Sequence, residues 1–295
     1  MKMSAHLLLQ AFLAETLLLL TVGGCGSHQN ASVDHPRLTP LVTMLEATFA
    51  SASLGKSMSY RVVLPATIAA GEKLPVVYLL HGGGGGSRDW TNDSDVAKLA
   101  EPGFILVMPE GDSSYYTNSD SHPEDRYEDY IVKDIISEAE SRYPIASGRA
   151  HRAILGVSMG GYGAVKIALK HPDLYAFAGG LSAAVDVPTR PFSIRRVAQW
   201  RFHSSIFGPE GSPTRRENDP YALARSVDPL KMPFLFLTCG EQESLLPANR
   251  KLVSIFAERG FSYEFHTKPG DHNWQQWNQQ LPGAFASLQR HLQAD

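Results

Sequence analysis

The chain has 295 residues, of which 43% are hydrophobic, 19% charged and 9% aromatic. This balance is that of an ordinary globular protein and excludes a disordered, collagen-like or coiled-coil chain. The 27 Lys and Arg residues face 30 Asp and Glu residues, for a formal net charge of −3, so no basic excess is available to neutralise a phosphate backbone. We therefore expect no nucleic-acid partner and favour a small substrate that carries little charge.

The first 24 residues have the pattern of an export signal. Lys2 precedes a mostly apolar stretch at 7–22, which Glu15 interrupts, and the stretch is therefore unlike the ~20 apolar residues of a membrane span. The sequence V-G-G-C, which ends at Cys25, is similar to bacterial lipoprotein signals, in which the Cys becomes the lipidated first residue. We expect an exported protein, which is periplasmic, secreted, or an outer-membrane lipoprotein attached through Cys25.

A polar segment at 25–40 shows no apolar period and is predicted to be a tether to a folded domain at 41–295. In this domain, short apolar runs alternate with longer helical patterns, which predicts a mostly parallel sheet covered by helices on both faces. The expected strands are 60–64, 76–80, 104–108, 153–155, 177–181, 234–237 and 262–266. The expected helices are 127–142, 159–170, 247–259 and 274–291.

Five consecutive glycines follow the expected strand at 76–80, in the sequence H-G-G-G-G-G-S that begins at His81. A phosphate-binding loop would require a Lys after the last glycine, and the dinucleotide-binding spacing is not completed either. The remaining interpretation is a loop whose unhindered backbone N–H groups face a developing negative charge. We predict that the Gly83 N–H is one such donor and that His81 has a structural role.

The sequence G-V-S-M-G-G at 156–161 contains G-x-S-x-G between an expected strand and an expected helix. A serine on a strained strand-to-helix turn exposes its hydroxyl, and glycines two positions away on either side avoid collisions with the neighbouring backbone. This context identifies Ser158 as the candidate nucleophile. The Met159 N–H, at the start of the helix, is the candidate second donor to an oxyanion.

An insertion without a strand pattern, at about 186–229, separates two expected strands. Joined to the carboxyl ends of strands, such an insertion can cover the crevice in which ligands bind. We interpret it as a small cap, and a plain helical excursion on the surface is the alternative.

A serine hydroxyl needs an imidazole to accept its proton and a carboxylate to orient that imidazole. Among the histidines after the nucleophile, His272 stands in a glycine-bearing loop, P-G-D-H-N-W, between a strand and the final helix. The acid is expected after the strand at 234–237, and a count of three from the glycine at 240 reaches Glu243. Glu241 is the alternative acid, and Asp271 is less favoured because a residue adjacent to the base points its side chain elsewhere.

With these motifs in place, the chain from about residue 57 onwards resembles the esterase D-like branch of the α/β-hydrolase superfamily. The resemblance rests on L-L-H-G-G-G-G-G at 79–86, M-P-E-G-D-S-S-Y-Y-T-N at 108–118, Y-E-D-Y-I at 127–131, G-V-S-M-G-G-Y-G-A at 156–164, C-G-E-Q-E at 239–243 and G-D-H-N-W at 270–274. It implies an α/β-hydrolase fold and esterase activity. The chain departs from most members in one respect, because it has Glu243 where they have Asp. The resemblance also suggests that Trp90, Tyr115 and Tyr116 line the acyl or alcohol pocket, with a core or rim position as the alternative.

We therefore expect a serine carboxylesterase that hydrolyses short acyl or arylacyl esters, of the acetyl or feruloyl type, free or linked to a polysaccharide, through an acyl-enzyme. No cofactor is expected, and no cluster of His, Cys or carboxylate residues has the spacing of metal ligands. Three alternatives remain, which are an acyltransferase with the same triad, a thioesterase of the S-formylglutathione type, and a non-enzymatic binding domain on this fold.

Overall fold

A computed structural model of the chain describes residues 33–292. The expected export signal, Cys25 and the first half of the predicted tether, residues 25–32, lie outside the described residues. The described part of the tether has no regular secondary structure, but it is held on the domain, since the Asp34 carboxylate pairs with Arg61 at 2.8 Å and the Arg37 N–H donates to the Thr91 carbonyl at 2.8 Å. The compact unit that contains the sheet begins at Asp34.

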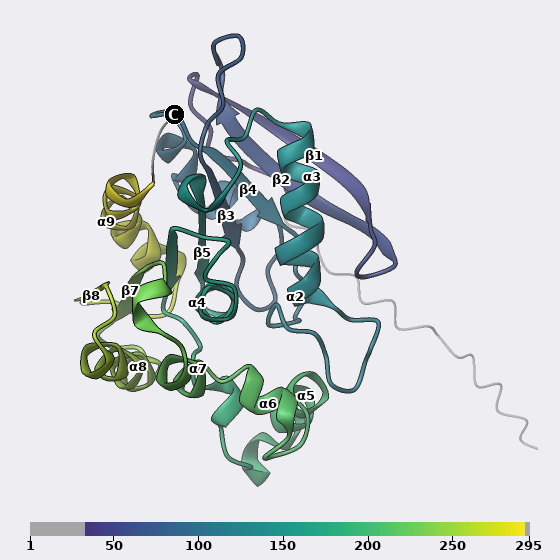
Figure 1. The fold of residues 1–295 in the computed structure, drawn as a ribbon, viewed down its shortest axis with the longest axis vertical. Helices are drawn as coiled ribbons and strands as arrows, with labels where there is room; N and C mark the ends of the chain where they lie inside the picture. Colours follow the sequence, from purple (N-terminus) through teal and green to yellow (C-terminus); the bar gives the residue numbers. More distant parts are fainter. Residues whose placement is uncertain (1–32, 293–295) are drawn as a thin grey trace, which may run out of the picture. The chain divides into compact units, whose positions relative to one another are not determined.

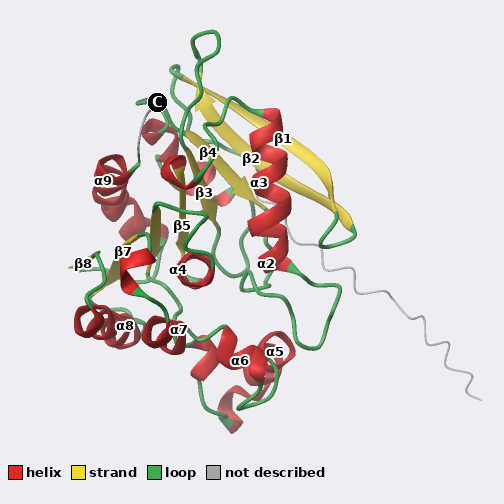
Figure 2. Ribbon diagram, in the orientation of Figure 1, coloured by secondary structure: helices red, strands yellow, loops and turns green. Residues whose placement is uncertain are grey.

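An eight-stranded sheet forms the centre of this unit, with the strand order β1-β2-β4-β3-β5-β6-β7-β8 (Figures 1 and 2). Strands β1, β2 and β4 pair antiparallel, and all other neighbours pair parallel. The strands are β1 Val42–Ser51, β2 Lys56–Pro65, β3 Val76–Leu80, β4 Ile105–Pro109, β5 Arg152–Val157, β6 Phe177–Leu181, β7 Phe234–Gly240 and β8 Tyr263–Lys268. The expected mostly parallel α/β-hydrolase sheet is confirmed.

The first strand was not expected from the sequence. β1 lies at the edge of the sheet and pairs only with β2 over a ten-residue register from Val42 opposite Pro65 to Ser51 opposite Lys56. One side of an edge strand meets solvent, and most of the side chains of β1 are exposed or half-buried, so the strand lacks the continuous apolar run that marks the buried strands β3 to β6.

Helices cover both faces of the sheet, as expected (Figure 2). One apolar cluster joins the sheet to α3, α4 and α8, and a second joins its other face to α1 and α9. The α-helices are α1 Asp89–Asp93, α2 Tyr127–Asp129, α3 Ile136–Arg142, α4 Met159–Lys170, α5 Val197–Phe207, α6 Pro213–Glu217, α7 Pro220–Ser226, α8 Leu246–Arg259 and α9 Trp274–His291. Short 3-10 segments occupy Val96–Leu99, Arg149–His151, Val187–Thr189, Ile194–Arg196 and Pro229–Lys231, and the π-helical segment Tyr130–Ile135 joins α2 to α3.

The insertion at 186–229 folds as the helices α5, α6 and α7 with short 3-10 segments, between β6 and β7. Its helices α5 and α6 form the lower end of the domain in Figure 1. The insertion begins directly after the loop that follows β6. In that loop the Ala184 N–H donates to the Ser158 carbonyl at 3.1 Å. We keep the name cap for residues 186–229. None of the helices found in residues 33–292 is long and apolar enough to cross a lipid bilayer.

Candidate active site

Ser158 stands on the turn between β5 and α4 with φ 55° and ψ −112°. A side chain at Gly156 would place its Cβ 2.2 Å from the backbone of Gly160, and a Cβ at Gly160 would lie 2.2 Å from the Leu80 carbonyl oxygen. The G-x-S-x-G pattern is therefore a packing requirement, since helix α4 starts against the end of β3 with no room for a side chain. The strained conformation aims the serine side chain away from the sheet.

The structure brings the three residues of the expected triad together. The His272 Nε2 atom lies 2.8 Å from the Ser158 hydroxyl oxygen, and its Nδ1 atom lies 2.7 Å from Oε2 of Glu243. The Glu243 side chain has no exposed surface, whereas the His272 side chain is 38% exposed. A buried carboxylate that accepts the Nδ1 proton leaves Nε2 free to accept the serine proton, which is the arrangement that a nucleophilic serine requires.

The second oxygen of Glu243 is fixed by two donors. Its Oε1 accepts from the Ser182 hydroxyl at 2.6 Å and from the Gly240 N–H at 2.7 Å, and the Trp277 indole N–H donates to the Ser182 oxygen at 2.9 Å. Burial alone would raise the pKa of Glu243, but the hydrogen bonds from His272, Ser182 and the Gly240 N–H outweigh it and lower the pKa. Glu243 is therefore held as a carboxylate in one orientation.

The alternative acids lie elsewhere. Glu241 and Asp271 are exposed, and the Glu241 carboxylate accepts from the Thr267 hydroxyl at 3.4 Å. Among residues 33–292, the carboxylate that is hydrogen-bonded to the His272 ring is that of Glu243.

The glycine loop after β3 lies beside the nucleophile. A Cβ at Gly82 would be 3.6 Å from that of Ser158, and one at Gly83 would be 3.9 Å from that of Met159. In residues 33–292, neither the Gly83 N–H nor the Met159 N–H has a hydrogen-bond acceptor. Two unpaired donors beside the serine hydroxyl can stabilise an oxyanion.

The His81 side chain is completely buried and contacts the backbone of this glycine loop. Its Nδ1 lies 2.8 Å from the carbonyl oxygen of Gly82, and its Nε2 lies 2.9 Å from the Gly111 N–H and 3.2 Å from Glu110. The Gly82 carbonyl and the Gly83 N–H belong to one peptide group, so the His81 contact fixes the direction of the candidate donor.

Glu110, directly after β4, is a second support that the sequence analysis did not identify. Its carboxylate accepts from the Ser87 N–H at 3.1 Å and the Asp112 N–H at 3.2 Å, and it faces His81. Burial raises the pKa of Glu110, yet the His81 contact and the backbone N–H donors lower it to about 2. This carboxylate therefore ties the far end of the glycine loop to the loop after β4.

The three aromatic residues suggested as pocket lining differ in position. Trp90 and Tyr116 have no exposed surface. Trp90 packs edge-on against Trp274 with ring centroids 5.2 Å apart, and the Tyr116 hydroxyl donates to the His81 carbonyl at 3.0 Å. Both are core residues and present no surface to a ligand here. Tyr115 is half-buried and lies between the body and the cap, with its hydroxyl 3.2 Å from His203 Nε2.

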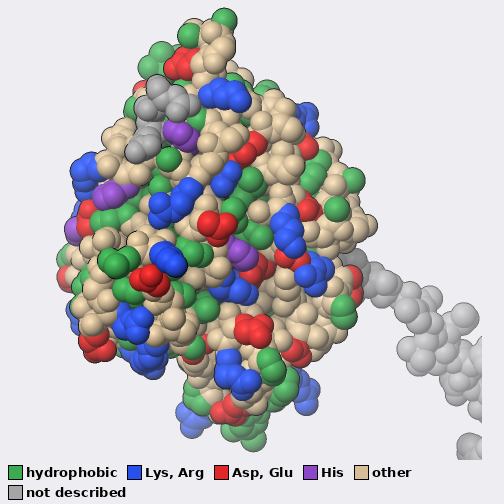
Figure 3. Space-filling view, viewed as in Figure 1, with side chains coloured by type: hydrophobic (Ala, Val, Ile, Leu, Met, Phe, Trp, Pro, Cys, Tyr) green, Lys and Arg blue, Asp and Glu red, His purple; other side chains and the backbone are tan. Residues whose placement is uncertain are grey.

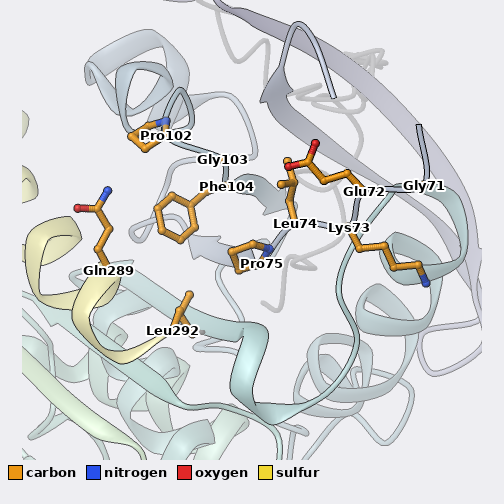
Figure 4. A pocket seen from close by; sticks show the side chains of 10 residues that line it. All are labelled: Gly71, Glu72, Lys73, Leu74, Pro75, Pro102, Gly103, Phe104, Gln289 and Leu292. Atoms are coloured by element: carbon orange, nitrogen blue, oxygen red, sulfur yellow. The ribbon is translucent and has the colours of Figure 1, made fainter. Parts of the chain in front are cut away.

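A surface cavity of about 540 Å³ lies at the amino-terminal ends of the central strands β3 and β4 (Figure 4). Its lining residues include Leu74 and Pro75, which precede β3, and Phe104, which precedes β4. Ser158 follows the carboxyl end of the parallel strand β5, so this cavity is unconnected to the triad. Within residues 33–292, no group of three or more His, Cys, Asp or Glu side chains is placed to hold a metal ion.

The family profile described as "Putative esterase" matches residues 51–288. The chain belongs to this family. It is therefore an esterase, a carboxylic ester hydrolase, and the resemblance noted from its motifs is confirmed. The esterase is 27% identical over 259 residues to the acetyl esterase of Caldicellulosiruptor saccharolyticus, across 83% of this chain and 97% of that protein.

Two further relatives extend the comparison. The endo-1,4-beta-xylanase/feruloyl esterase of Xylanibacter ruminicola is 23% identical over 259 residues, which cover 82% of this chain but only 31% of that longer protein. The solved structure of fluorophosphonate-binding serine hydrolase F from Staphylococcus aureus, with substrate bound, superposes with a TM-score of 0.72 at 25% identity, over 84% of this esterase and 98% of that chain.

Proposed function

We propose that this esterase is a serine carboxylesterase that cleaves short acyl or arylacyl esters through a covalent acyl-enzyme on Ser158. The observation that carries the proposal is the position of His272, whose two ring nitrogens lie within 2.8 Å of the Ser158 oxygen and the Glu243 carboxylate. The names of an acetyl esterase and a feruloyl esterase among the relatives support the acyl groups chosen.

In the first half-reaction, the Ser158 oxygen attacks the ester carbonyl while His272 Nε2 takes the hydroxyl proton. The Gly83 and Met159 N–H groups donate to the carbonyl oxygen as it becomes negative, and Glu243 stabilises the imidazolium. The bond to the alcohol oxygen then breaks, His272 returns the proton to the leaving alcohol, and the acyl group remains bonded to the serine.

In the second half-reaction, water replaces the alcohol. His272 accepts a proton from the water, the resulting hydroxyl attacks the acyl carbonyl, and the C–O bond to Ser158 breaks as the proton moves to the serine oxygen. The products are the carboxylic acid and the free enzyme. These steps use only the chain's own residues and water.

The test combines trapping with kinetics. The esterase is mixed with p-nitrophenyl acetate at low pH, and intact-mass and peptide spectra should show an acetyl group on Ser158. Ser158→Ala should lose about 10⁶-fold in kcat with an unchanged circular dichroism spectrum. An acetyl group on another residue, or a variant that keeps a tenth of the activity, would contradict the proposal.

A substrate panel then defines the acyl group. Aryl esters from acetyl to decanoyl, methyl ferulate and acetylated xylan are compared by kcat/KM, and glycerol is added to detect acyl transfer. We expect the highest values for acetyl or feruloyl esters, with the free acid as main product. Acyl-glycerol as the main product would identify an acyltransferase instead.

We also propose, from the N-terminal sequence alone, that the esterase is exported. Expressed from its own N-terminus in a bacterium, it should be found in the cell envelope fraction, and Cys25→Ala should release it from the membrane. Full-length protein in the cytosol with residues 1–24 intact would contradict export, and a Cys25→Ala variant that stays on the membrane would contradict lipidation.

A further inference from the structure

The cap carries a group of exposed apolar side chains. Of the nine large hydrophobic residues that are exposed in the described chain, four fall within eleven consecutive positions, namely Phe192, Ile194, Val197 and Phe202, with exposed fractions of 53%, 81%, 38% and 42%. Trp200 packs edge-on against Phe192, with ring centroids 5.3 Å apart. We call these five residues the cap patch. Soluble proteins seldom expose neighbouring large apolar side chains without a binding role.

The segment that contains the cap patch is basic, and Asp186 and Glu210 flank it. Residues 187–209 contain four arginines and neither Asp nor Glu, in a chain whose net charge is −3. Arg190 is paired with Asp186 at 2.8 Å. The other three, Arg195, Arg196 and Arg201, are exposed, and no carboxylate in residues 33–292 pairs with them. Figure 3 shows hydrophobic side chains at the lower tip of the molecule, where α5 and α6 lie, with Lys and Arg side chains near them and Asp or Glu side chains among them.

Helix α5 explains why these side chains stay in solvent. Its buried residues are His203, Ile206 and Phe207, and they attach the helix to the body through the Tyr115 ring, whose centroid lies 5.4 Å from that of His203 and 5.6 Å from that of Phe207. Of the cap-patch residues on α5, Phe202 also meets the Tyr115 ring, with centroids 6.4 Å apart, while 42% of its surface stays exposed. The buried residues of α5 therefore anchor the helix to the body while Val197 and much of Phe202 remain in solvent.

The same contact places the patch near the esterase site. The Tyr115 ring also packs edge-on against Tyr162, with centroids 5.8 Å apart, and Tyr162 lies one helical turn after Ser158 on α4. A partner surface bound to the cap patch would therefore lie near the part of the cap that packs beside the candidate active site.

We propose that the cap patch docks this esterase on an anionic lipid surface. Aromatic and aliphatic side chains at the level of the headgroups, with arginines beside them, are the composition that binds such an interface. A second copy of the chain fits less well, because a symmetric contact would set the unpaired arginines of one copy against those of the other. The proposal does not depend on the catalytic role of Ser158.

The test uses the full chain and vesicles of ether-linked phosphatidylglycerol, which contain no carboxylic ester that the enzyme could cleave. Hydrogen exchange of peptides from 190–203 is followed as vesicles are added, since this local measurement is insensitive to membrane contacts of the N-terminal segment. We expect strong protection with phosphatidylglycerol and little with ether-linked phosphatidylcholine. The double variant Arg195→Gln/Arg196→Gln should need about 30-fold more lipid for half-protection, because each arginine near an anionic surface strengthens binding about fivefold.

Two further variants separate the patch from general surface effects. Phe192→Ser/Ile194→Ser should abolish the protection while hydrolysis of a soluble ester is unchanged. The matched control Leu230→Ser/Lys231→Gln changes an exposed leucine and an exposed lysine outside the patch and should bind vesicles as the unaltered chain does. Equal protection by both lipids, no protection, or protection that rises with protein concentration without lipid, as a second copy would give, would each overturn the proposal.

Discussion

Replacing Glu243 by Gln tests the proposed triad most directly, because the two oxygens of the carboxylate have different partners. Oε1 accepts from the Ser182 hydroxyl and the Gly240 N–H, and Oε2 accepts from His272. If the amide oxygen of Gln keeps the first two bonds, its NH₂ group faces Nδ1 of His272. That nitrogen must then accept, so the ring proton moves to Nε2, which can no longer accept the proton of Ser158.

The opposite orientation of the amide would set its NH₂ against the Gly240 N–H in a buried site, which costs about 1–3 kcal/mol for unmatched polar groups. We therefore expect the unproductive tautomer to dominate and kcat to fall by about 10⁴-fold. The fold should survive, since the shape of the side chain is unchanged. The measurement is kcat for a soluble aryl acetate, with urea unfolding as the check on the fold.

Glu241→Gln is the matched control, because it makes the same chemical change two residues away on an exposed side chain. It should remain within about threefold of the unaltered enzyme, less than 1 kcal/mol of transition-state stabilisation. Glu243→Asp should lose about 100-fold, since the shorter side chain retreats from His272 by about a bond length. An active Glu243→Gln beside an inactive Glu241→Gln would refute the assignment of the acid.

Three predictions concern stability. The pKa of Glu110 is lowered from its ordinary 4.5 to about 2 in the folded state, so its contribution of about 3 kcal/mol to the free energy of unfolding is present above pH 4.5 and is lost as the pH falls toward 2. Glu110→Gln should unfold at a lower urea concentration at pH 7, and its stability should depend less on pH in acid. A pH dependence equal to that of the unaltered chain would contradict this. Lys166 is completely buried, where burial lowers its pKa to about 8, and it pairs with the buried Glu128 carboxylate at 2.6 Å, which Lys170 also contacts at 2.8 Å. Lys166→Met should cost about 3–5 kcal/mol in urea unfolding because it removes the buried partner of that carboxylate, whereas Lys170→Met, at the partly exposed partner, should cost about 1 kcal/mol. Equal losses would show that burial is not the cause. Gly160→Ala should yield no soluble protein, since its Cβ would lie 2.2 Å from a carbonyl oxygen. Gly283→Ala is the control, because a Cβ at this helical position would have no neighbouring atom within 4 Å, and it should raise the free energy of unfolding by about 0.5–1 kcal/mol. A soluble and active Gly160→Ala variant would refute the steric explanation of the motif.

The parts of the fold that the sequence predicted are those with a strong local pattern. The strands from β3 to β7 are nearly continuous apolar runs, and their positions follow from that pattern with small differences at the ends. β1 was missed because its exposed edge gives it a mixed sequence. The helical pattern at 127–142 is interrupted by the π-helical turn at Tyr130–Ile135, and no local residue preference announces such a turn.

The residues of the candidate site also differ in whether a local sequence pattern predicts them. Ser158 stands in a motif whose spacing has a steric cause, so a local pattern is enough to find it. Ser182 and Trp277, which support Glu243, are far from it in sequence and meet only when β6, β7 and α9 come together. No local sequence motif predicts such contacts between distant residues. The run G-D-H-N-W-Q-Q-W at 270–277 does, however, place an indole a few residues after His272.

The position of Trp277 on the final helix affects the order in which the site can be completed during synthesis. Its indole N–H holds the hydroxyl that orients the acid, and its ring packs edge-on against His272, with centroids 5.1 Å apart. Both residues are translated after every strand of the sheet. Since chains emerge from the ribosome in order, the strained serine and its glycine loop can form early, but the proton acceptor and its support arrive together at the end. With His272 as the proposed proton acceptor, we expect a nascent chain to gain hydrolytic activity only once α9 has docked.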